Sequence, residues 1–286
     1  MTIFTFSALF VLGLILGSFL NVVIFRYHPE NFLFSPAPLR GRSKCRDCGR
    51  TLSWYELFPL LSFLIQFGRC RSCGARLSWQ YPLVEFLTGV IFLTPIYFYS
   101  PISPAYSVAT GFFWTFILML FLVLAGIDYR WFIIPDELNV LLAISGLVKI
   151  AWDDLYGDFG IFSGAFIGSF SALFGLRENI WLNHFAGAAA GLAIVGLIIW
   201  LTKERGMGWG DFKLVGALGV IFGWPDIIFL LAFSFIIGSV YGLYVLATGK
   251  KGMKDSVPFG PFLVFGSLAL IFFGNDILRS YFSIFI

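Results

Sequence analysis

Residues 206–222 read GMGWGDFKLVGALGVIF, an apolar segment that opens with three glycines and one aspartate, Asp211. A second apolar segment, TFILMLFLVLAGI at residues 115–127, ends directly before Asp128. Carboxylates at the edge of the membrane hydrocarbon cost free energy, so they usually have a function. Two carboxylates in a partly dehydrated site do not readily both ionise, and they share one proton. The two aspartates therefore suggest a pair in which one member activates water and the other polarises a carbonyl group.

The composition indicates a membrane protein. The chain has 286 residues, of which 59% are hydrophobic and 12% are charged, and its mean hydropathy is +0.88. A soluble domain is far less apolar. The candidate membrane spans occupy residues 4–26, 82–100, 108–127, 137–151, 183–202, 211–224, 227–247 and 257–276. We predict an all-α polytopic membrane protein with about eight transmembrane helices. The first run lacks the cleavage site of a signal peptide, so we expect it to be retained.

The distribution of charge predicts the orientation. Basic residues outnumber acidic ones between residues 26 and 80, and the positive-inside rule places this segment in the cytoplasm and the N-terminus outside. Two crossings follow this segment, so residues 128–136 are again in the cytoplasm and residues 137–151 cross back out. The same rule places residues 203–210 in the cytoplasm, so an odd number of crossings must lie between residues 152 and 202. Two apolar stretches lie there, and we expect the Gly- and Ser-rich one, residues 159–176, not to cross. The alternative is that both cross and the charge rule fails locally.

We divide the chain into a first transmembrane helix at residues 1–26, a cytoplasmic zinc-binding insert at residues 27–81 and a transmembrane domain at residues 82–286. Because topology explains the basic residues, the net charge of +3 does not indicate a nucleic-acid partner, and we expect the lipid bilayer as the main surroundings.

The insert contains all four cysteines of the chain, in two C-x2-C pairs: Cys45 with Cys48, and Cys70 with Cys73. Two such pairs present four thiolates in the tetrahedral arrangement that zinc prefers, and the glycine after each pair allows a tight turn. Two disulfides or four unconnected thiols are the alternatives, and a reducing cytoplasm disfavours disulfides. Four cysteines leave no open coordination position, so we expect a structural rather than a catalytic metal.

Between the cysteine pairs, residues 54–64 read WYELFPLLSFL and are mostly apolar. Such a stretch is typical of an amphipathic surface that lies on the membrane. It is equally typical of a hydrophobic cover for the metal site.

The other acidic residues receive different interpretations. Asp136 follows Ile-Pro and precedes an apolar run, so we expect it in the first turn of a helix. We expect Asp153, Asp154 and Asp158 in an external loop, and Asp226 and Asp255 in solvent beside turns. Glu85 lies within a span and has no assigned role; it is either functional or a buried hydrogen-bond partner for another span.

Asp128 and Asp211 remain as the pair, because the predicted topology places both at cytoplasmic ends of spans. The glycines beside Asp211 would let a substrate strand approach it. The motif G-x-G-D alone is weak evidence, since glycines also serve helix packing in membranes.

Several sequence blocks together resemble the type IV prepilin peptidases, which are GxGD aspartic proteases of the membrane. The blocks occur in the family's order and comprise GSFLNVVI at 17–24, both cysteine pairs, YPLVE at 81–85, Asp128 with IIPDELN at 133–139, GMGWGDFKL at 206–214 and PFGPF at 258–262.

The resemblance implies cleavage of a basic leader from prepilins or pseudopilins of type IV pili or type II secretion, at the cytoplasmic face of the bacterial inner membrane. It implies that Asp128 and Asp211 are catalytic and that Cys45, Cys48, Cys70 and Cys73 bind zinc. Members with the cysteine-bearing insert typically also methylate the new N-terminal amine with S-adenosylmethionine, although the sequence shows no Gly-rich nucleotide loop. The alternatives are a peptidase without methyltransferase activity and an ion-coupled transporter with a zinc-knuckle cap.

Overall fold

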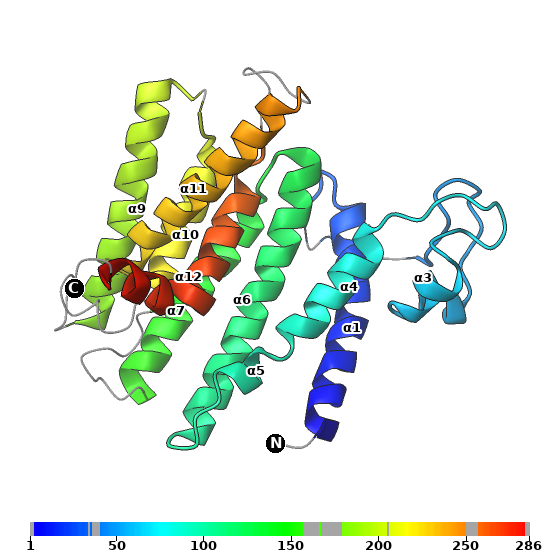
Figure 1. Cartoon of the computed structure of the whole chain (residues 1–286), viewed down its shortest axis with the longest axis horizontal. Coiled ribbons are helices and arrows are strands. Elements are labelled where there is room, and N and C mark those ends of the chain that lie inside the picture. Colours follow the sequence, from blue (N-terminus) through cyan, green and yellow to red (C-terminus); the bar gives the residue numbers. More distant parts are fainter. Residues whose placement is uncertain are drawn as a thin grey trace. The chain divides into compact units, whose positions relative to one another are not determined.

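The computed structural model describes residues 3–33, 35, 41–156, 166, 179–204, 206–249 and 257–283 (Figure 1). The regular secondary structure of these residues is helical, with two isolated β-bridges in the insert, which confirms the all-α prediction. The contacts divide the chain into two compact units, Met1–Val123 and Leu124–Ile286.

In the first unit a long helix packs along a shorter one. The elements are α1 (Ile3–Arg26), the 3-10 turn η1 (Trp54–Leu57), α3 (Leu61–Ile65), α4 (Gln80–Ile91), α5 (Thr94–Tyr97) and the first part of α6 (Pro104–Trp131). α1 lies against α4. A Cβ atom on Gly13 would come within 2.6 Å of the Thr88 carbonyl oxygen, and one on Gly17 within 2.7 Å of the Glu85 Cα atom. The two helices approach this closely because α1 has glycine at both positions.

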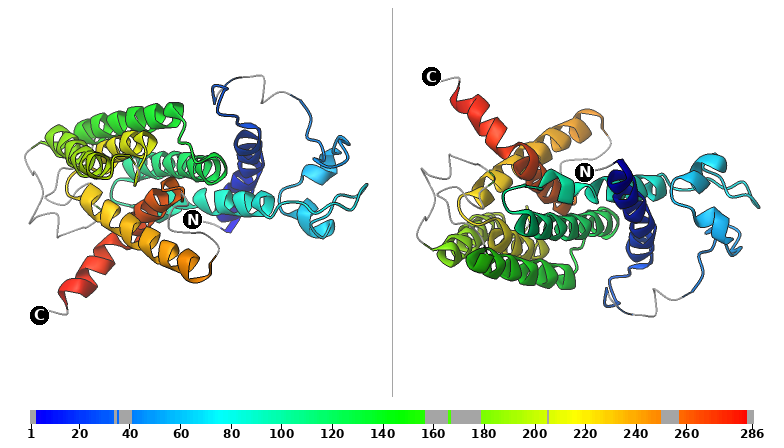
Figure 2. Two further views of the ribbon diagram at one scale, coloured as in Figure 1. Left: turned by 90° about the horizontal axis from the view of Figure 1, so that it is seen from above. Right: turned by 90° about the horizontal axis from the view of Figure 1, so that it is seen from below.

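In the second unit a short helix lies between two longer ones. The elements are the last part of α6, α7 (Asp136–Tyr156), α9 (Ile180–Thr202), α10 (Trp209–Phe222), α11 (Asp226–Ala247) and α12 (Gly260–Phe282). α10 packs against both α7 and α9, and α11 packs against α12 and α9 (Figure 2). A Cβ atom on Gly219 would lie 2.4 Å from the Ala188 Cα atom, so α10 also needs a glycine to approach its neighbour.

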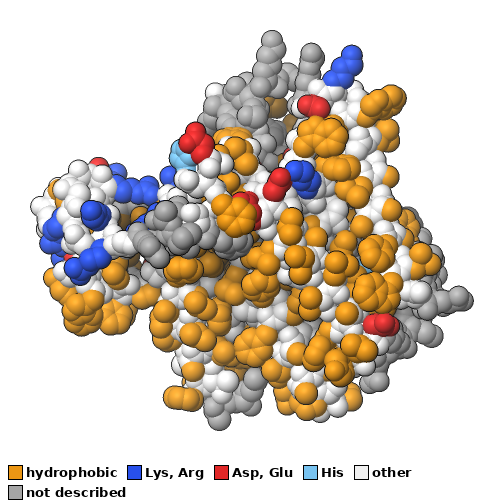
Figure 3. Space-filling model, turned by 180° about the vertical axis from the view of Figure 1, so that it is seen from behind, with side chains coloured by type: hydrophobic (Ala, Val, Ile, Leu, Met, Phe, Trp, Pro, Cys, Tyr) orange, Lys and Arg blue, Asp and Glu red, His pale blue; other side chains and the backbone are white. Residues whose placement is uncertain are grey.

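Five helices of the described part are long and apolar enough to cross a membrane: α1, α6, α9, α11 and α12. The three other expected spans coincide with α4 and α5, with α7, and with α10. Because α10 has 14 residues and rises about 1.5 Å per residue, it is shorter than the hydrocarbon core, and the number of crossings stays a prediction. The expected non-crossing stretch, 159–176, lies outside the described residues except for Phe166. Hydrophobic side chains dominate the face shown in Figure 3.

Two expectations about acidic residues are wrong, while Asp158 and Asp255 lie outside the described residues. Asp153 and Asp154 are not in a loop, because α7 continues to Tyr156 and Asp153 forms a buried ion pair with Lys149 one turn earlier. Asp226 is not in solvent: it is 1% exposed, and its carboxylate accepts a hydrogen bond of 2.8 Å from the backbone N–H of Phe166. Pairing and hydrogen bonding allow charged groups to be buried.

Candidate functional site

Asp128 lies near the C-terminal end of α6 and contacts the beginning of another helix. Its side chain is buried, and its Oδ2 atom accepts a hydrogen bond of 2.9 Å from the backbone N–H of Gly260, the first residue of α12. The first N–H groups of a helix lack partners within the helix and carry a partial positive charge. Asp128 therefore satisfies one of these groups while α12 stabilises the carboxylate.

Asp211 is the third residue of α10. Its Oδ2 atom accepts a hydrogen bond of 3.1 Å from the backbone N–H of Gly208, the residue that precedes the helix. An acid at this position that binds back to the cap stabilises the start of a helix. The side chain is partly exposed. A Cβ atom on Gly208 would find its nearest neighbour, the Oδ2 atom of Asp211, at 3.8 Å, so this approach to the carboxylate is open.

The two aspartates lie near each other within the second unit. The negative charge of Asp211 is close enough to act on the Asp128 carboxylate by electrostatic repulsion. Each carboxylate is held by a backbone N–H at the start of a helix, and one is buried while the other is partly exposed. We call Asp128 and Asp211 the aspartate pair. Two such carboxyl groups can act on one water molecule, one as a base and the other as an acid.

A third acid at this site has a partner that the sequence pattern did not indicate. Asp136 occupies the first turn of α7, as predicted, and its two carboxylate oxygens accept from the Lys213 ammonium at 2.9 and 2.8 Å. Lys213 follows Asp211 by two positions on α10, so the ion pair links α10 to α7 beside the aspartate pair. Both side chains are more than half exposed, and such pairs add only about 0–1 kcal/mol to stability.

The four cysteines of the insert form one cluster. Their sulfur atoms all lie within 4.8 Å of one another, and those of Cys45 and Cys73 are 3.8 Å apart. Four sulfurs at about 2.3 Å from a tetrahedral zinc ion are about 3.8 Å apart, so the cluster could hold a metal ion of this kind. All four thiols are free, and two of them are buried.

The two cysteine loops have the same backbone construction. In the first, the N–H of Cys45 donates to the carbonyl of Arg50 at 2.9 Å; in the second, the N–H of Cys70 donates to that of Ala75 at 2.8 Å. Gly49 and Gly74 both have a φ of 70°, in the left-handed region that glycine adopts without strain. The tight turns expected from these glycines are therefore present in both loops.

The thiols compete for negative charge. Hydrogen bonds from the backbone, first that of Cys73, lower the pKa of the Cys70 thiol to about 6. A backbone hydrogen bond from Ala75 favours the Cys73 thiolate, yet burial and the three other sulfurs raise the pKa of Cys73 to about 12. Four adjacent thiolates repel one another, so they are stable only with a cation between them. Binding of a metal ion would supply this charge and release the remaining protons.

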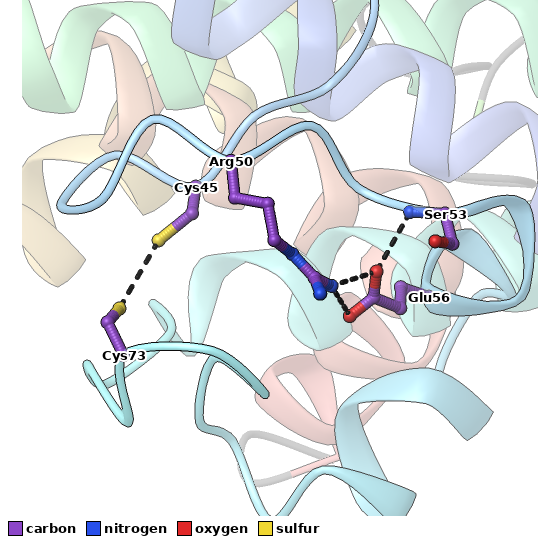
Figure 4. A network of polar contacts seen from close by, with 5 residues as sticks. All are labelled: Cys45, Arg50, Ser53, Glu56 and Cys73. Atoms are coloured by element: carbon purple, nitrogen blue, oxygen red, sulfur yellow. Dashed lines mark hydrogen bonds and ion pairs between the residues drawn. The ribbon is translucent and has the colours of Figure 1, made fainter.

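An ion pair supports the first cysteine loop (Figure 4). The Nη2 atom of Arg50 contacts both carboxylate oxygens of Glu56 at 2.6 and 2.5 Å, and Glu56 also accepts from the backbone N–H of Ser53 at 2.8 Å. The Glu56 side chain is buried. Since a buried carboxylate is stable only when paired, this contact fixes the 3-10 turn η1 to the loop that carries Cys45.

Glu85, unassigned from the sequence, is a buried hydrogen-bond acceptor. Its Oε2 atom accepts from the backbone N–H of Leu60 at 2.8 Å. One partner is thus in the insert, and Ser18 of α1 also forms a hydrogen bond with this carboxyl group, as expected for a buried partner of another span. The bond from Leu60 joins α4 to the turn before α3, where Leu60 has a φ of 57°.

Comparison with known families identifies two matching regions. Residues 11–99 match a family model described as Bacterial Peptidase A24 N-terminal domain, and residues 114–243 match one described as Type IV leader peptidase family. No solved structure matches the chain.

Individual relatives match over nearly the whole length. A protein of Xanthomonas campestris pv. campestris is 31% identical over 96% of this chain and 94% of its own. One of Burkholderia pseudomallei strain 1026b is 31% identical over 93% and 84%, and one of Aeromonas salmonicida strain A449 is 30% identical over 97% and 94%. All three are named prepilin leader peptidase/N-methyltransferase.

Proposed function

Because the chain belongs to the type IV leader peptidase family, we propose that it cleaves the basic leader from prepilins or pseudopilins with the aspartate pair, Asp128 and Asp211, as the catalytic residues. The basic insert and the positive-inside rule favour cleavage at the cytoplasmic face of the bacterial inner membrane. Family membership speaks against an ion-coupled transporter.

In the proposed reaction one carboxylate of the pair removes a proton from water, and the water oxygen forms a bond to the scissile carbonyl carbon. The other carboxyl group, which carries the shared proton, donates a hydrogen bond to the carbonyl oxygen. The tetrahedral intermediate then collapses, the carbon–nitrogen bond breaks, and the leaving amine takes a proton from the pair.

The observation that carries the proposal is the placement of the pair. Its two carboxylates come from residues 83 positions apart, yet they lie near enough to repel each other, and among the described residues each is held by an N–H group and not by a cation. A carboxylate held without a basic side chain keeps its capacity to bind a proton.

The test uses purified full-length protein in detergent and a prepilin of the same organism. Asp128→Asn and Asp211→Asn each retain shape and hydrogen bonding but lose the proton-binding group, so cleavage should fall at least about 1,000-fold. Asp276→Asn, which changes an exposed aspartate on α12, is the matched control and should keep full activity. Full cleavage by either pair variant, in protein that is folded, contradicts the assignment.

We further propose that the protein methylates the new N-terminal amine with S-adenosylmethionine, the second activity in the relatives' names. Mass measurement of the mature pilin decides this: product formed with S-adenosylmethionine present should gain the mass of one methyl group. Cleaved but unmethylated product would show a peptidase alone.

For the insert we propose one structural zinc ion bound by Cys45, Cys48, Cys70 and Cys73. The sulfur spacing and the two matching loops support this. The ion would neutralise the thiolates and stabilise a segment too small to form a core of its own. Purified protein should contain about one zinc per chain, and Cys45→Ser or Cys73→Ser should lose it. Metal-free protein with an equally stable insert would contradict the proposal.

A further inference from the structure

The insert exposes many of its large apolar side chains. Among them are Trp54, Phe58, Leu61, Leu64, Phe67 and Trp79, which we call the aromatic patch. Phe67 is 89% exposed, and Trp79 is 75% exposed. Exposed aromatic and aliphatic side chains gathered on one small segment indicate a surface that contacts something apolar.

The patch is not a cover for the cysteine cluster. In α3, Phe63 is the buried residue, while Leu61, Leu64 and Ile65 point outward. The backbone on either side of this helix adopts left-handed conformations that bulky side chains rarely take, with a φ of 57° at Leu60 and 51° at Phe67. Such conformations persist where the surrounding structure enforces them and are concentrated at functional positions.

Basic residues border the same surface. An open groove of about 500 Å³ is lined by apolar residues of the patch and by Arg69 and Arg76, which pair across an antiparallel bridge. Both arginines are exposed. In Figure 3 the insert, at the left, shows Lys and Arg side chains above and hydrophobic ones below. Arginines next to an aromatic and aliphatic surface are typical of segments at a membrane interface, where the guanidinium groups meet lipid phosphates.

A bilayer interface lies within reach of the insert. The insert joins α1, a candidate membrane span that ends at Arg26, to α4, which begins at Gln80. In Figure 1, α3 lies on the lower side of the insert, the direction in which α1 and α4 run away from it. The hydrogen bond from Leu60 to Glu85 holds this side of the insert to α4.

From these observations we infer that the aromatic patch docks the insert onto the interfacial region of its own bilayer, with Arg69 and Arg76 on the headgroups of anionic phospholipids. A basic pilin leader does not fit this surface, because the arginines repel it. Docking at two places, through α1 and through the patch, fixes the insert relative to the membrane plane.

The test places a photoreactive benzoylphenylalanine at position 67 of the full-length, zinc-containing protein in nanodiscs. The same residue at position 200, in place of the exposed Trp200 of the candidate span α9, is the positive control, and at the exposed, basic position Arg42 it is the negative control. One bilayer contains phosphatidylethanolamine with phosphatidylglycerol, and the other contains phosphatidylcholine alone.

Position 67 should form lipid adducts as position 200 does, several-fold more with phosphatidylglycerol present, while position 42 should not. The double substitution Arg69→Gln and Arg76→Gln should abolish the preference for phosphatidylglycerol with the zinc content unchanged. Hydrogen exchange of the unaltered chain should show residues 61–67 better protected in the anionic bilayer, and less so at high salt.

Absence of lipid adducts at position 67, with position 200 reacting normally, would overturn the inference. The inference would also be overturned if S-adenosylmethionine or a prepilin, added before irradiation, prevented formation of the lipid adduct, since the groove would then be a ligand site. These outcomes are independent of the aspartate pair, because the measurements do not require cleavage.

Discussion

Gly260 is the residue whose substitution tests the site most directly. Its backbone N–H binds the Oδ2 atom of Asp128 at 2.9 Å, and a Cβ atom added to it would lie 2.6 Å from that same oxygen. Its φ is not positive, so alanine can adopt the backbone without strain. The main local effect of Gly260→Ala is therefore to push the carboxylate away from its donor.

The expected magnitude follows from the bond that is lost. A hydrogen bond to a charged group contributes about 1.5–3 kcal/mol. If the transition state loses this stabilisation, the cleavage rate falls tenfold for each ~1.4 kcal/mol. The expected loss of rate is therefore about 10- to 100-fold. The next contact, 3.1 Å from Leu124, is tight but involves the end of a flexible side chain, so we expect little added cost.

The assay measures kcat and KM for prepilin cleavage in detergent, together with the thermal unfolding temperature. Gly242→Ala is the matched control, because a Cβ atom on this glycine of α11 meets nothing within 4 Å. We expect kcat to fall for the substitution at Gly260 and to stay unchanged for that at Gly242. A folded Gly260→Ala protein with the wild-type kcat would refute the proposed role of the hydrogen bond in catalysis.

Three further substitutions test the first unit. Gly17→Ala should lower the free energy of unfolding by about 1–3 kcal/mol, seen as a lower unfolding temperature, because its Cβ atom would meet the backbone of α4. An unchanged unfolding temperature would contradict the close packing. Glu85→Ala should leave the Leu60 N–H unpaired and cost about 1–3 kcal/mol, seen as faster proteolysis of the insert, whereas Glu85→Gln should restore protection. Arg50→Gln should leave the Glu56 carboxylate buried without its cation and so speed zinc loss to a chelator; equal release rates would count against this support.

The positions of the helices were largely predictable, because a membrane span must be apolar and must satisfy its own backbone hydrogen bonds. The C-terminal end of α7 was not, since the expected span ended at residue 151 and the predicted topology placed the next residues in a loop. Lys149 and Asp153 are four positions apart, and this spacing could have indicated a helical ion pair. Asp226 offered no comparable signal, because its partner Phe166 is 60 positions away.

In the site, too, the sequence indicated single residues but not the contacts between residues far apart in the chain. Motifs nominated Asp128 and Asp211, and the first-turn position of Asp136 followed from the proline before it. The contact of Asp128 with Gly260 joins residues 132 positions apart, and that of Asp136 with Lys213 joins residues 77 apart. Neither pairing follows from local pattern, because folding alone brings those helix ends together.

The three acids of the site differ in the groups that hold their carboxylates. Asp136 is bound by the Lys213 ammonium, which carries a full positive charge. Asp128 and Asp211 are held by neutral N–H groups at the starts of α12 and α10. A helix start offers hydrogen bonds and a partial positive charge without a full countercharge, so it orients a carboxylate while leaving it able to exchange a proton. Lys213, although only two positions from Asp211, is occupied by Asp136. The ion pair thus holds Lys213 on an acid outside the aspartate pair.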